Sequence, residues 1–407
     1  MNDSNTLEDY VLRRADMATR AIPGIMNLLL AKNPWFVAVD ALKTSTNEAG
    51  GAFASFAHYD YLSLSAHPRV IEAGQDALLR YGAGAGASRL VGGERTVHRQ
   101  LEREMASFLG QQAALCLPAG YLVSMTLIPH LMTSNDLIVI DSLSHNSIVN
   151  GCKASRAKML TFRHGDLDHL EEILKRERSR FRACLIVVEG LYSMDGDIVD
   201  LPRVIELKKR WNSWLMVDEA HSIGVLGKTG RGICEHFDIA PGEVDIVLGT
   251  LSKSFVSMGG FLGGRRILIE WLKLTLPGFV FSAGLSPVLT ATALAALRVL
   301  RDEPERVERL TVISRYFLDV AQAAGIATGP AIGKGIVPLL FDRQETTLAV
   351  SQRLAEAGIY VPPVIRVGVP TDAPRIRFFL SADTSRPLVE RTFGVLKSAL
   401  SAEERAG

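Results

Sequence analysis

"ACLIVVEG" (residues 183–190) and "SWLMVDEA" (residues 213–220) decide the fold class, because each is a short apolar run that ends in polar residues. Strands of this kind are buried on both faces, as in a parallel sheet covered by helices. Helical patterns separate these runs from similar ones, which read "AALCLPAG", "DLIVIDS", "VDIVLGT" and "GGFLGG". The alternation predicts an α/β fold with a large, mostly parallel sheet, flanking helices and right-handed crossovers.

Changes in the pattern of apolar and polar residues along the sequence predict three segments. Residues 1–55 are mixed and include the apolar patch "IPGIMNLLLA" (residues 22–31), which is too short to span a membrane. We expect this patch to pack on the body of the protein, and contact with a membrane surface remains an alternative. Residues 56–290 carry the alternating pattern and predict the large domain. Residues 291–407 predict a smaller C-terminal α+β domain, where a long helical stretch from Pro287 precedes strands at "GIVPLLF" and "RIRFFLS".

The composition argues against several classes of protein. The 407 residues carry 45 Lys and Arg against 44 Asp and Glu, with no basic stripe, which disfavours a nucleic-acid partner. The N-terminus is polar and acidic, unlike a signal peptide, and no stretch predicts a transmembrane segment. The cysteines form no C-x-x-C pair, so we expect no metal site and reduced, buried thiols in a cytoplasmic protein: Cys116, Cys152, Cys184 and Cys234.

Polar or ionisable residues follow four consecutive apolar runs. These ends read "DSLSHNS", "LYSMDGD", "DEAHSIG" and "TLSKS". In open α/β sheets, ligands bind at the carboxyl ends of the strands. Helix capping would explain one such end, but four in succession that include Asp, His and Lys predict one shared site.

Asp218 and Lys253 indicate the chemistry of that site. A carboxylate at the end of a buried run needs a cation, either an arginine or the ring nitrogen of a bound cofactor. Lys253 stands among Gly, Ser and Thr without a neighbouring charge. Desolvation lowers the pKa of such a lysine, and the neutral amine reacts with carbonyl groups. Together with the glycines and hydroxyls, this pair matches the needs of pyridoxal 5'-phosphate (PLP).

Four further motifs each allow a simpler interpretation beside a functional one. His145 is either a structural residue or a ring that stacks on the cofactor, and Ser193 is either a turn residue or a partner of the phenolic oxygen of PLP. "GVLGKTG" (residues 224–230) resembles part of a phosphate loop, but Ser222 replaces its first glycine and no strand–loop–helix context surrounds it. "YGAGAGASRLVGG" (residues 81–93) follows no apolar run, so we expect it to approach a ligand or a second subunit closely.

Six motifs, in order from about residue 59 to the C-terminus, resemble the α-oxoamine synthases. They read "YDYLSLSAHPRV", "GASRLVGGERTVHRQLE", "DSLSHNSIVNG", "VVEGLYSMDGDIVDLP", "VDEAHSIGVLGKTGRG" and "GTLSKSFVSMGGFLGG". The wording is most similar to serine palmitoyltransferase-like members. The resemblance implies a fold-type I PLP-dependent transferase that forms a homodimer with shared active sites.

The resemblance also implies a reaction. An amino acid, with L-serine as first choice, would condense with an acyl thioester and lose CO2, giving an α-amino ketone and a free thiol, as in sphingolipid biosynthesis. Alanine or glycine with a carrier-protein-bound acyl chain, and 8-amino-7-oxononanoate synthase, are the alternatives. CoA and a carrier protein both remain open as acyl donors. A non-catalytic partner of the same fold would lack the reactive lysine, whereas Lys253 is present. The "YSMDGD" wording disfavours an aminotransferase.

The same resemblance implies roles for individual residues. Lys253 would bind the cofactor aldehyde and take the α-proton, and Asp218 would pair with the pyridinium nitrogen. His221 and Ser193 would contact the phenolic oxygen, and His145 would stack over the ring. Arg377 would bind the substrate carboxylate. Ser282 would contact the cofactor phosphate of the neighbouring subunit. The residues on the phosphate side of the cofactor in the same subunit would be Gly120, Tyr121, Thr250 and Ser252.

Three positions depart from the family pattern. Ser124 and Gly165 stand where asparagine is usual, and Thr384 replaces a histidine. None of the three removes a residue expected to be catalytic. They put the identity of the substrate and the geometry of carboxylate binding in question.

Overall fold

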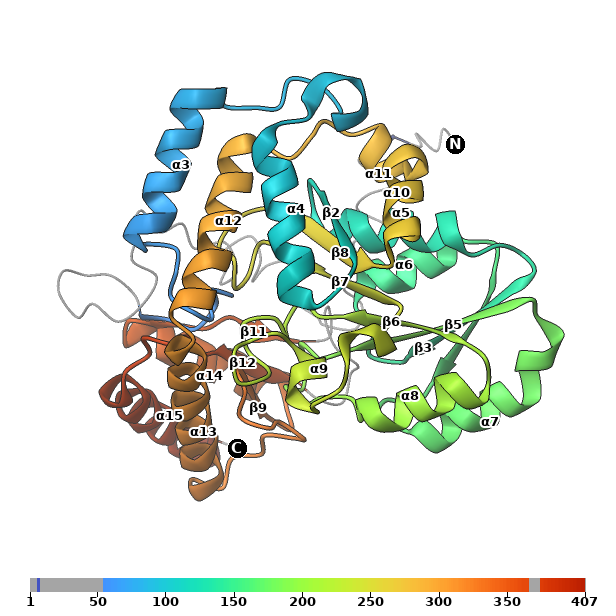
Figure 1. Cartoon of the computed structure of the whole chain (residues 1–407). Helices are drawn as coiled ribbons and strands as arrows, with labels where there is room; N and C mark the ends of the chain where they lie inside the picture. Colours follow the sequence, from blue (N-terminus) through green and yellow to red (C-terminus); the bar gives the residue numbers. More distant parts are fainter. Residues whose placement is uncertain (1–5, 8–53, 366–373, 407) are drawn as a thin grey trace. The chain divides into compact units, whose positions relative to one another are not determined.

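The computed structural model describes residues 6–7, 54–365 and 374–406 (Figure 1). The expected N-terminal segment and its apolar patch at residues 22–31 lie almost wholly outside these residues. All elements discussed below belong to one compact unit, Leu42–Gly407. Within the described part of the chain, no helix is long and apolar enough to cross a membrane. The four cysteines are buried and free of disulfides, as expected.

A seven-stranded sheet forms the centre of the large domain, with the strand order β2-β8-β7-β6-β5-β3-β4 (Figure 1). The neighbouring pairs among β3 to β7 are parallel, and β8 runs antiparallel to both β7 and β2. The predicted mostly parallel sheet is therefore confirmed. Every apolar run quoted above forms a strand: β2 (Ala113–Leu117), β3 (Asp136–Asp141), β5 (Ala183–Glu189), β6 (Trp214–Asp218), β7 (Ile246–Thr250) and β8 (Gly260–Gly264).

One strand of the sheet, β4 (Lys158–Phe162), does not stand out as an apolar run in the sequence. This strand lies at the edge of the sheet and pairs with β3. Only Phe162 among its residues is fully buried. An edge strand needs fewer apolar side chains than a central one, so its sequence carries a weaker signal.

Helices cover both faces of the sheet, as the continuous apolar runs predict. Along β5, Cys184, Ile186 and Val188 pack into one cluster of buried side chains, and Leu185 and Val187 pack into another. The helices of the second cluster are α5 (Gly120–Leu131), α6 (Asn146–Ala154), α10 (Arg266–Thr275) and α11 (Pro277–Val280), whereas those of the first include α4 (Thr96–Leu109), α7 (Leu167–Glu177) and α8 (Leu201–Arg210).

The long helical stretch after the large domain consists of two helices, α12 (Pro287–Asp302) and α13 (Glu305–Ala323). The break falls at Pro304, which lacks an amide donor and disfavours the helical conformation of the residue before it. Helix α12 packs against α4 and against α3 (Pro68–Tyr81). The boundary expected at residues 290/291 therefore falls inside a helix that contacts the large domain.

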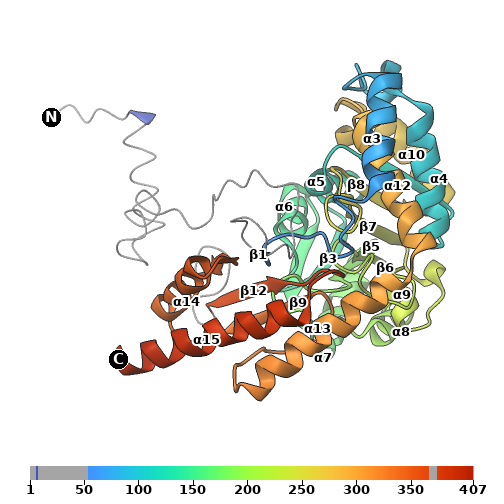
Figure 2. The same cartoon turned by 90° about the vertical axis from the view of Figure 1, so that its left-hand side faces the viewer.

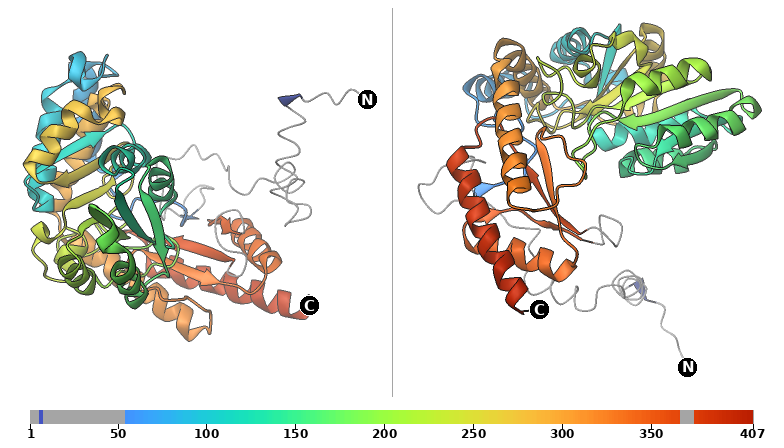
Figure 3. Two further views of the ribbon diagram at one scale, coloured as in Figure 1. Left: turned by 90° about the vertical axis from the view of Figure 1, so that its right-hand side faces the viewer. Right: turned by 90° about the horizontal axis from the view of Figure 1, so that it is seen from below.

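A three-stranded antiparallel sheet, β11-β12-β9, forms the centre of the C-terminal part (Figures 2 and 3). Phe317 of α13 lies 4.9 Å from both Phe378 and Phe393, measured between ring centroids. These contacts tie α13 to β12 and to the last helix. The elements of this part are β9 (Ile336–Leu340), α14 (Gln344–Glu356), β10 (Ile359–Tyr360), β11 (Pro363–Val364), β12 (Arg375–Phe379) and α15 (Arg386–Ala406), and β10 pairs with β1 (Ala54–Ser55).

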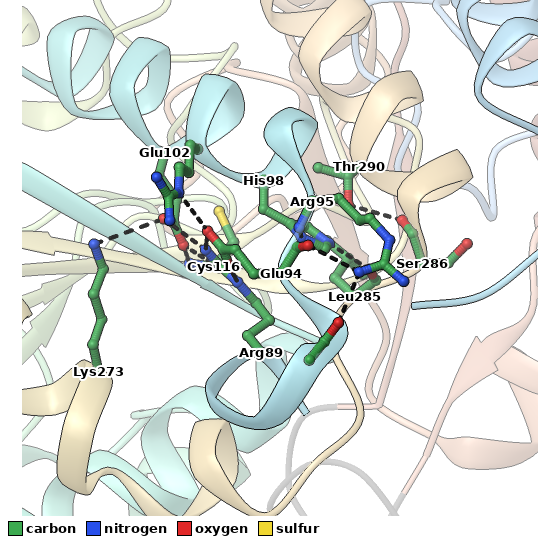
Figure 4. A network of polar contacts seen from close by, with 12 residues as sticks. Arg89, Glu94, Arg95, His98, Glu102, Cys116, Lys273, Leu285, Ser286 and Thr290 are labelled. Atoms are coloured by element: carbon green, nitrogen blue, oxygen red, sulfur yellow. Dashed lines mark hydrogen bonds and ion pairs between the residues drawn. The ribbon is translucent and has the colours of Figure 1, made fainter. Parts of the chain in front are cut away.

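A buried ion network holds the glycine-rich loop that precedes α4 (Figure 4). Arg89, in the short π-helix η1 (Arg89–Gly93), pairs with both Glu94 and Glu102. Glu102 also accepts a hydrogen bond of 3.0 Å from the backbone amide of Cys116 on β2. Arg89 is 7% and Glu102 is 5% exposed. Because loss of either partner would leave a buried charge unpaired, this network fixes the loop against α4 and β2.

Candidate active site

A polar cavity of about 380 Å³ lies at the carboxyl ends of β5, β6 and β7. The loop before α6, the start of α5 and strand β12 supply the rest of its lining. Ser282 alone among the predicted site residues lies outside this cavity, where it is half-buried. The structure brings the others together: Gly120, Tyr121, His145, Ser193, Asp218, His221, Thr250, Ser252, Lys253 and Arg377.

Lys253 occupies a tight turn after β7. Its carbonyl accepts a hydrogen bond of 2.9 Å from the amide of Val256. The next residue, Ser254, donates from Oγ to the carbonyl of Ile223 at 2.6 Å. Gly224 has a φ of +79°, and a Cβ there would lie 2.5 Å from Ser254 Oγ. The "GVLGKTG" motif therefore braces the lysine turn, and no strand–loop–helix of a phosphate loop surrounds it.

The environment of Lys253 raises the fraction of neutral amine above that of an exposed lysine. Burial lowers its pKa to about 8, although Asp218 and Glu189 attract the charged form. Nζ lies 5.5 Å from the centroid of the Tyr59 ring. With this pKa, about a tenth of the amine is neutral at pH 7, far more than for an exposed lysine. The side chain can therefore act as a nucleophile or a base.

Two buried carboxyl groups stand side by side beneath Lys253. Glu189 and Asp218 are paired residues of β5 and β6 and are 3% and 5% exposed. Burial and then the neighbouring Asp218 raise the pKa of Glu189 well above its usual range. Burial also raises the pKa of Asp218, whereas Lys253 lowers it. One cation faces two carboxyl groups, so the arrangement keeps Glu189 protonated and leaves Asp218 to face a cationic ring.

His221 is held as a neutral imidazole of defined orientation. Its Nδ1 lies 2.7 Å from the hydroxyl of Tyr61, and both residues are buried. Burial, followed by Lys253 and Arg377, lowers the pKa of His221 well below its usual value. Burial raises the pKa of Tyr61 well above its usual value, so the phenol keeps its proton. Since Nδ1 of His221 is the one hydrogen-bond partner of this hydroxyl among the described residues, we assign the hydroxyl as the donor and Nδ1 as the acceptor. The ring N–H of His221 is therefore on Nε2, where it can donate to a ligand.

His145 ends the loop before α6. Its backbone amide donates to Glu189 Oε1 at 2.6 Å, and its Nδ1 lies 2.8 Å from Ser147 Oγ. Burial lowers the pKa of His145 in spite of the attraction of Asp218. A neutral ring is therefore fixed at the wall of the cavity, where it can stack on a flat ligand.

The start of α5 offers a cradle for phosphate. Ala119, which precedes the helix, makes no side-chain capping bond, so the first amides of α5 are open to a ligand. Thr250 and Ser252 lie opposite with their hydroxyls 2.7 Å apart. A Cβ on Gly120 would lie 2.9 Å from Thr250 Oγ1, so glycine is needed for this approach. With Lys253 and Asp218 across the cavity, the residues present fit PLP.

Two arginines of β12 have different surroundings. Arg375 is buried and pairs with Asp195. Arg377 lines the cavity and donates to the carbonyl of Ser193 at 2.6 Å. Its Nε is buried and has no hydrogen-bond partner among the described residues. Because Arg377 lines the cavity, its guanidinium can meet an anionic group of a ligand there.

Tyr59 and Glu189 line the cavity but are absent from the sequence predictions. Glu189 is the last residue of β5, as Asp218 is of β6, so the rule that found one would also have found the other. Tyr59 lies in the loop between β1 and α3 and packs edge-on against Phe379 at 4.7 Å between centroids. No pattern in the sequence indicates that contact.

Of the three departures from the family pattern, the structure explains Gly165 and gives the surroundings of Ser124 and Thr384. Gly165 has a φ of +67°, a region that glycine and asparagine share. Ser124 is buried in α5, and its carbonyl lies against Gly151 of α6, where a Cβ would come within 2.5 Å. Thr384 accepts a hydrogen bond of 3.0 Å from the amide of Ser381 and closes the turn after β12.

Comparisons with known proteins identify the family of this chain. The model of the family described as aminotransferase class I and II matches residues 53–393. A serine palmitoyltransferase of Bacteroides ovatus is 37% identical, over 91% of this chain and 93% of that protein. An 8-amino-7-oxononanoate synthase of Thermoanaerobacter pseudethanolicus is 34% identical, over 86% of each.

The fold comparison points to the same group. The structure of a serine palmitoyltransferase from S. paucimobilis with PLP and myriocin bound has a TM-score of 0.87 and 28% identity, over 94% of this chain and 98% of that one. The predicted fold-type I architecture is confirmed, as are PLP as the cofactor of the family and the class of PLP-dependent acyltransferases. The chain belongs to the class I and II aminotransferase family and, within it, to the α-oxoamine synthases.

Proposed function

We propose that this chain is a PLP-dependent acyltransferase that condenses L-serine with an acyl thioester. The carboxyl group of the amino acid leaves as CO2, its Cα forms a bond to the acyl carbon, and the thiolate departs and takes a proton. The product is an α-amino ketone. One observation carries the proposal: Lys253, Asp218 and Arg377 line the same cavity.

PLP would be held at both ends of this cavity. Its phosphate would meet the amides at Gly120 and the hydroxyls of Thr250 and Ser252, and its ring nitrogen would face Asp218. When bound, PLP supplies an aldehyde that captures amines and a ring that stabilises negative charge at Cα of the substrate. His145 would stack on the ring.

The other residues have roles in proton transfer and orientation. Lys253 Nζ, with a pKa of about 8, would accept the proton from Cα of the amino acid and return it. His221 would donate from Nε2 to the phenolic oxygen beside Ser193, because Tyr61 occupies its other nitrogen. Protonated Glu189 would add no second negative charge beside Asp218, which keeps the ring nitrogen protonated.

Arg377 would bind the carboxylate of the amino acid. Its Nη1 is bonded to the Ser193 carbonyl, and its guanidinium lies 4.6 Å from the centroid of the Phe379 ring, so it has little freedom to move. Tyr59 lines the same cavity, with its ring centroid 5.5 Å from Lys253 Nζ. Its ring would limit the room beside Cα, which supports an amino acid with a small side chain.

The proposal extends to the assembly and its substrates. The chain would act in the cytoplasm as a homodimer, and Ser282 of each copy would contact the phosphate in the other. This supports a role for Ser282 that agrees with its place outside the cavity of its own chain. The acyl group would arrive as an acyl-CoA or an acyl-carrier-protein thioester, and the product would enter lipid biosynthesis.

The visible spectrum of the PLP-loaded protein tests this proposal. L-serine, L-alanine and glycine are titrated separately, and the protein with Lys253→Ala serves as the control without the reactive amine. We expect a saturable shift of the cofactor band with L-serine and then release of CO2 and free thiol after a long-chain acyl-CoA is added. A shift with alanine or glycine alone would overturn the choice of serine, and failure to bind PLP would overturn the proposed function.

A further inference from the structure

The loop after β5 carries part of the cavity lining. Ser193 and Met194 line the cavity, and the amide of Tyr192 donates to the carbonyl of Asp197 at 2.9 Å. A bridge between Leu191 and Ile198 closes the base of the loop. The loop is short and closed, so contacts to its outer residues also determine where its inner residues lie.

The C-terminal part of the chain holds one side of this loop. Arg375 pairs with Asp195 and donates to the carbonyl of Met194 at 3.1 Å. The amide of Ile332 donates to the carbonyl of Gly196 at 3.1 Å. Together with the bond from Arg377 to Ser193, these contacts join the loop to the small sheet.

His164 holds the other side, from the large domain. It follows β4, and the order β5-β3-β4 places the end of β3 between it and the loop. Its Nδ1 donates to Asp141 at 2.9 Å and its Nε2 donates to Asp197 at 3.0 Å. Asp141 ends β3 and also accepts the amides of Leu143 and Gly165. One imidazole therefore connects the ends of three neighbouring strands.

Donation from both ring nitrogens requires an imidazolium. Burial alone would lower the pKa of His164, but the hydrogen bonds to Asp141 and Asp197 outweigh burial and raise the pKa to about 10. The side chain is 21% exposed and that of Asp141 is 1% exposed. The cation is thus the partner of a carboxylate that would otherwise be buried without one.

The other groups around His164 leave this charge balance intact. The ring of Tyr192 meets the imidazole edge-on, with 4.5 Å between centroids. Asp195 is close, and its carboxylate is paired with Arg375. On the segment of His164 itself, Arg163 pairs with Asp166. His164, Asp195 and Asp197 have the spacing of a metal site. Both nitrogens of the histidine are hydrogen-bonded to carboxylates, so the imidazolium supplies the positive charge that a metal ion would bring.

We propose that His164 is a positioning residue whose imidazolium joins the end of β3 to the loop that carries Ser193 and Met194. By fixing this loop, it sets the position of Arg377, which donates to Ser193, and so the geometry of the amino acid site. The inference rests on the proposed function only in assigning the substrate carboxylate to Arg377. His145 follows the same end of β3, so the bonds of His164 to Asp141 and Asp197 also connect the His145 segment with the loop.

The first test measures the protonation of the histidines. The full-length, PLP-loaded protein is labelled with 15N-histidine, and the signal that disappears in His164→Asn identifies this ring. We expect it to keep the imidazolium pattern at pH 8.5, where an unperturbed histidine is neutral. A signal that titrates below pH 8 would overturn the proposal, and this result does not depend on which amino acid the enzyme uses.

The second test measures positioning. The spectral titration gives the dissociation constant of L-serine for His164→Asn, and equilibrium dialysis gives that of PLP. Loss of hydrogen bonds to charged groups should weaken serine about tenfold and leave PLP within about twofold. His169→Asn is the matched control, because His169 accepts a hydrogen bond from the amide of Arg163 and lies outside the cavity lining.

A charge-balanced double variant separates positioning from loss of fold. His164→Asn with Asp141→Asn removes the cation together with its buried carboxylate, so we expect the free energy of unfolding to recover in part while serine affinity stays low, because the link to the loop is still lost. Equal serine affinity for His164→Asn and His169→Asn would overturn the proposal. A protein that binds PLP but no amino acid would contradict the proposed function. The 15N signal of His164 would still show whether its imidazolium joins Asp141 and Asp197.

Discussion

Replacing Tyr61 with phenylalanine removes one hydroxyl and keeps the packed ring. Tyr61 is fully buried, and its only polar atom lies 2.7 Å from Nδ1 of His221. The variant leaves this nitrogen buried without a donor, which costs about 2 kcal/mol, or nearly thirtyfold in an equilibrium constant. The N–H of His221 would then be free to move from Nε2 to Nδ1, away from the phenolic oxygen of PLP.

The assay compares PLP dissociation constants from equilibrium dialysis with the free energy of unfolding of the apoprotein in urea. We expect Tyr61→Phe to weaken PLP by about tenfold or more and to destabilise the apoprotein by about 1–2 kcal/mol. Tyr81→Phe is the control, because that half-buried tyrosine lies outside the cavity. If Tyr61→Phe bound PLP as tightly as Tyr81→Phe, the argument that Tyr61 fixes the tautomer of His221 would be refuted.

Four further predictions follow from the same structure. Lys253→Ala should lower turnover at least about a thousandfold and shift the cofactor band, and unchanged turnover would exclude Lys253 as the reactive amine. Arg377→Lys should raise KM for serine about tenfold with a smaller effect on kcat, because the planar fork is lost; steady-state kinetics would show the opposite if the arginine acted in the chemical step. Arg89→Met should lower the free energy of unfolding by about 3–5 kcal/mol, and adding Glu102→Gln should recover part of it in urea titrations. Burial raises the pKa of Glu219 to about 7. The folded protein therefore binds this proton more tightly than the unfolded chain, and the free energy of unfolding falls as the pH rises from about 4.5 through 7. In urea titrations, Glu219→Gln should be more stable than the parent by about 1–3 kcal/mol at pH 8 and equal to it at pH 5.

Much of the large domain could be predicted from hydrophobicity alone. Central strands must be apolar on both faces, so β3, β5 and β6 appear as continuous runs in the sequence. The edge strand β4 does not, because solvent reaches it. The helical stretch after Pro287 reads as one periodic pattern, and only the local chemistry of Pro304 divides it.

The site was predictable where it depends on strand ends and not where it depends on loops. Asp218 and Lys253 follow apolar runs, and parallel strands bring such ends to one edge of the sheet. Tyr59 lines the cavity and Tyr61 bonds to His221, both from the loop before α3, and the contacts of these tyrosines with Phe379 and His221 join residues far apart in sequence. Tertiary packing of that kind leaves no periodic signal in the sequence.

The close approach of Gly224 to Ser254 has a consequence for anyone who alters this enzyme by mutation. Gly224 lies outside the cavity lining, so a library restricted to cavity residues would omit it. Yet any side chain at Gly224 would push on Ser254, the neighbour of Lys253. A substitution at Gly224 can therefore change the position of the Lys253 amine although Gly224 lies outside the cavity. Random libraries should recover variants at Gly224 that fold but are inactive.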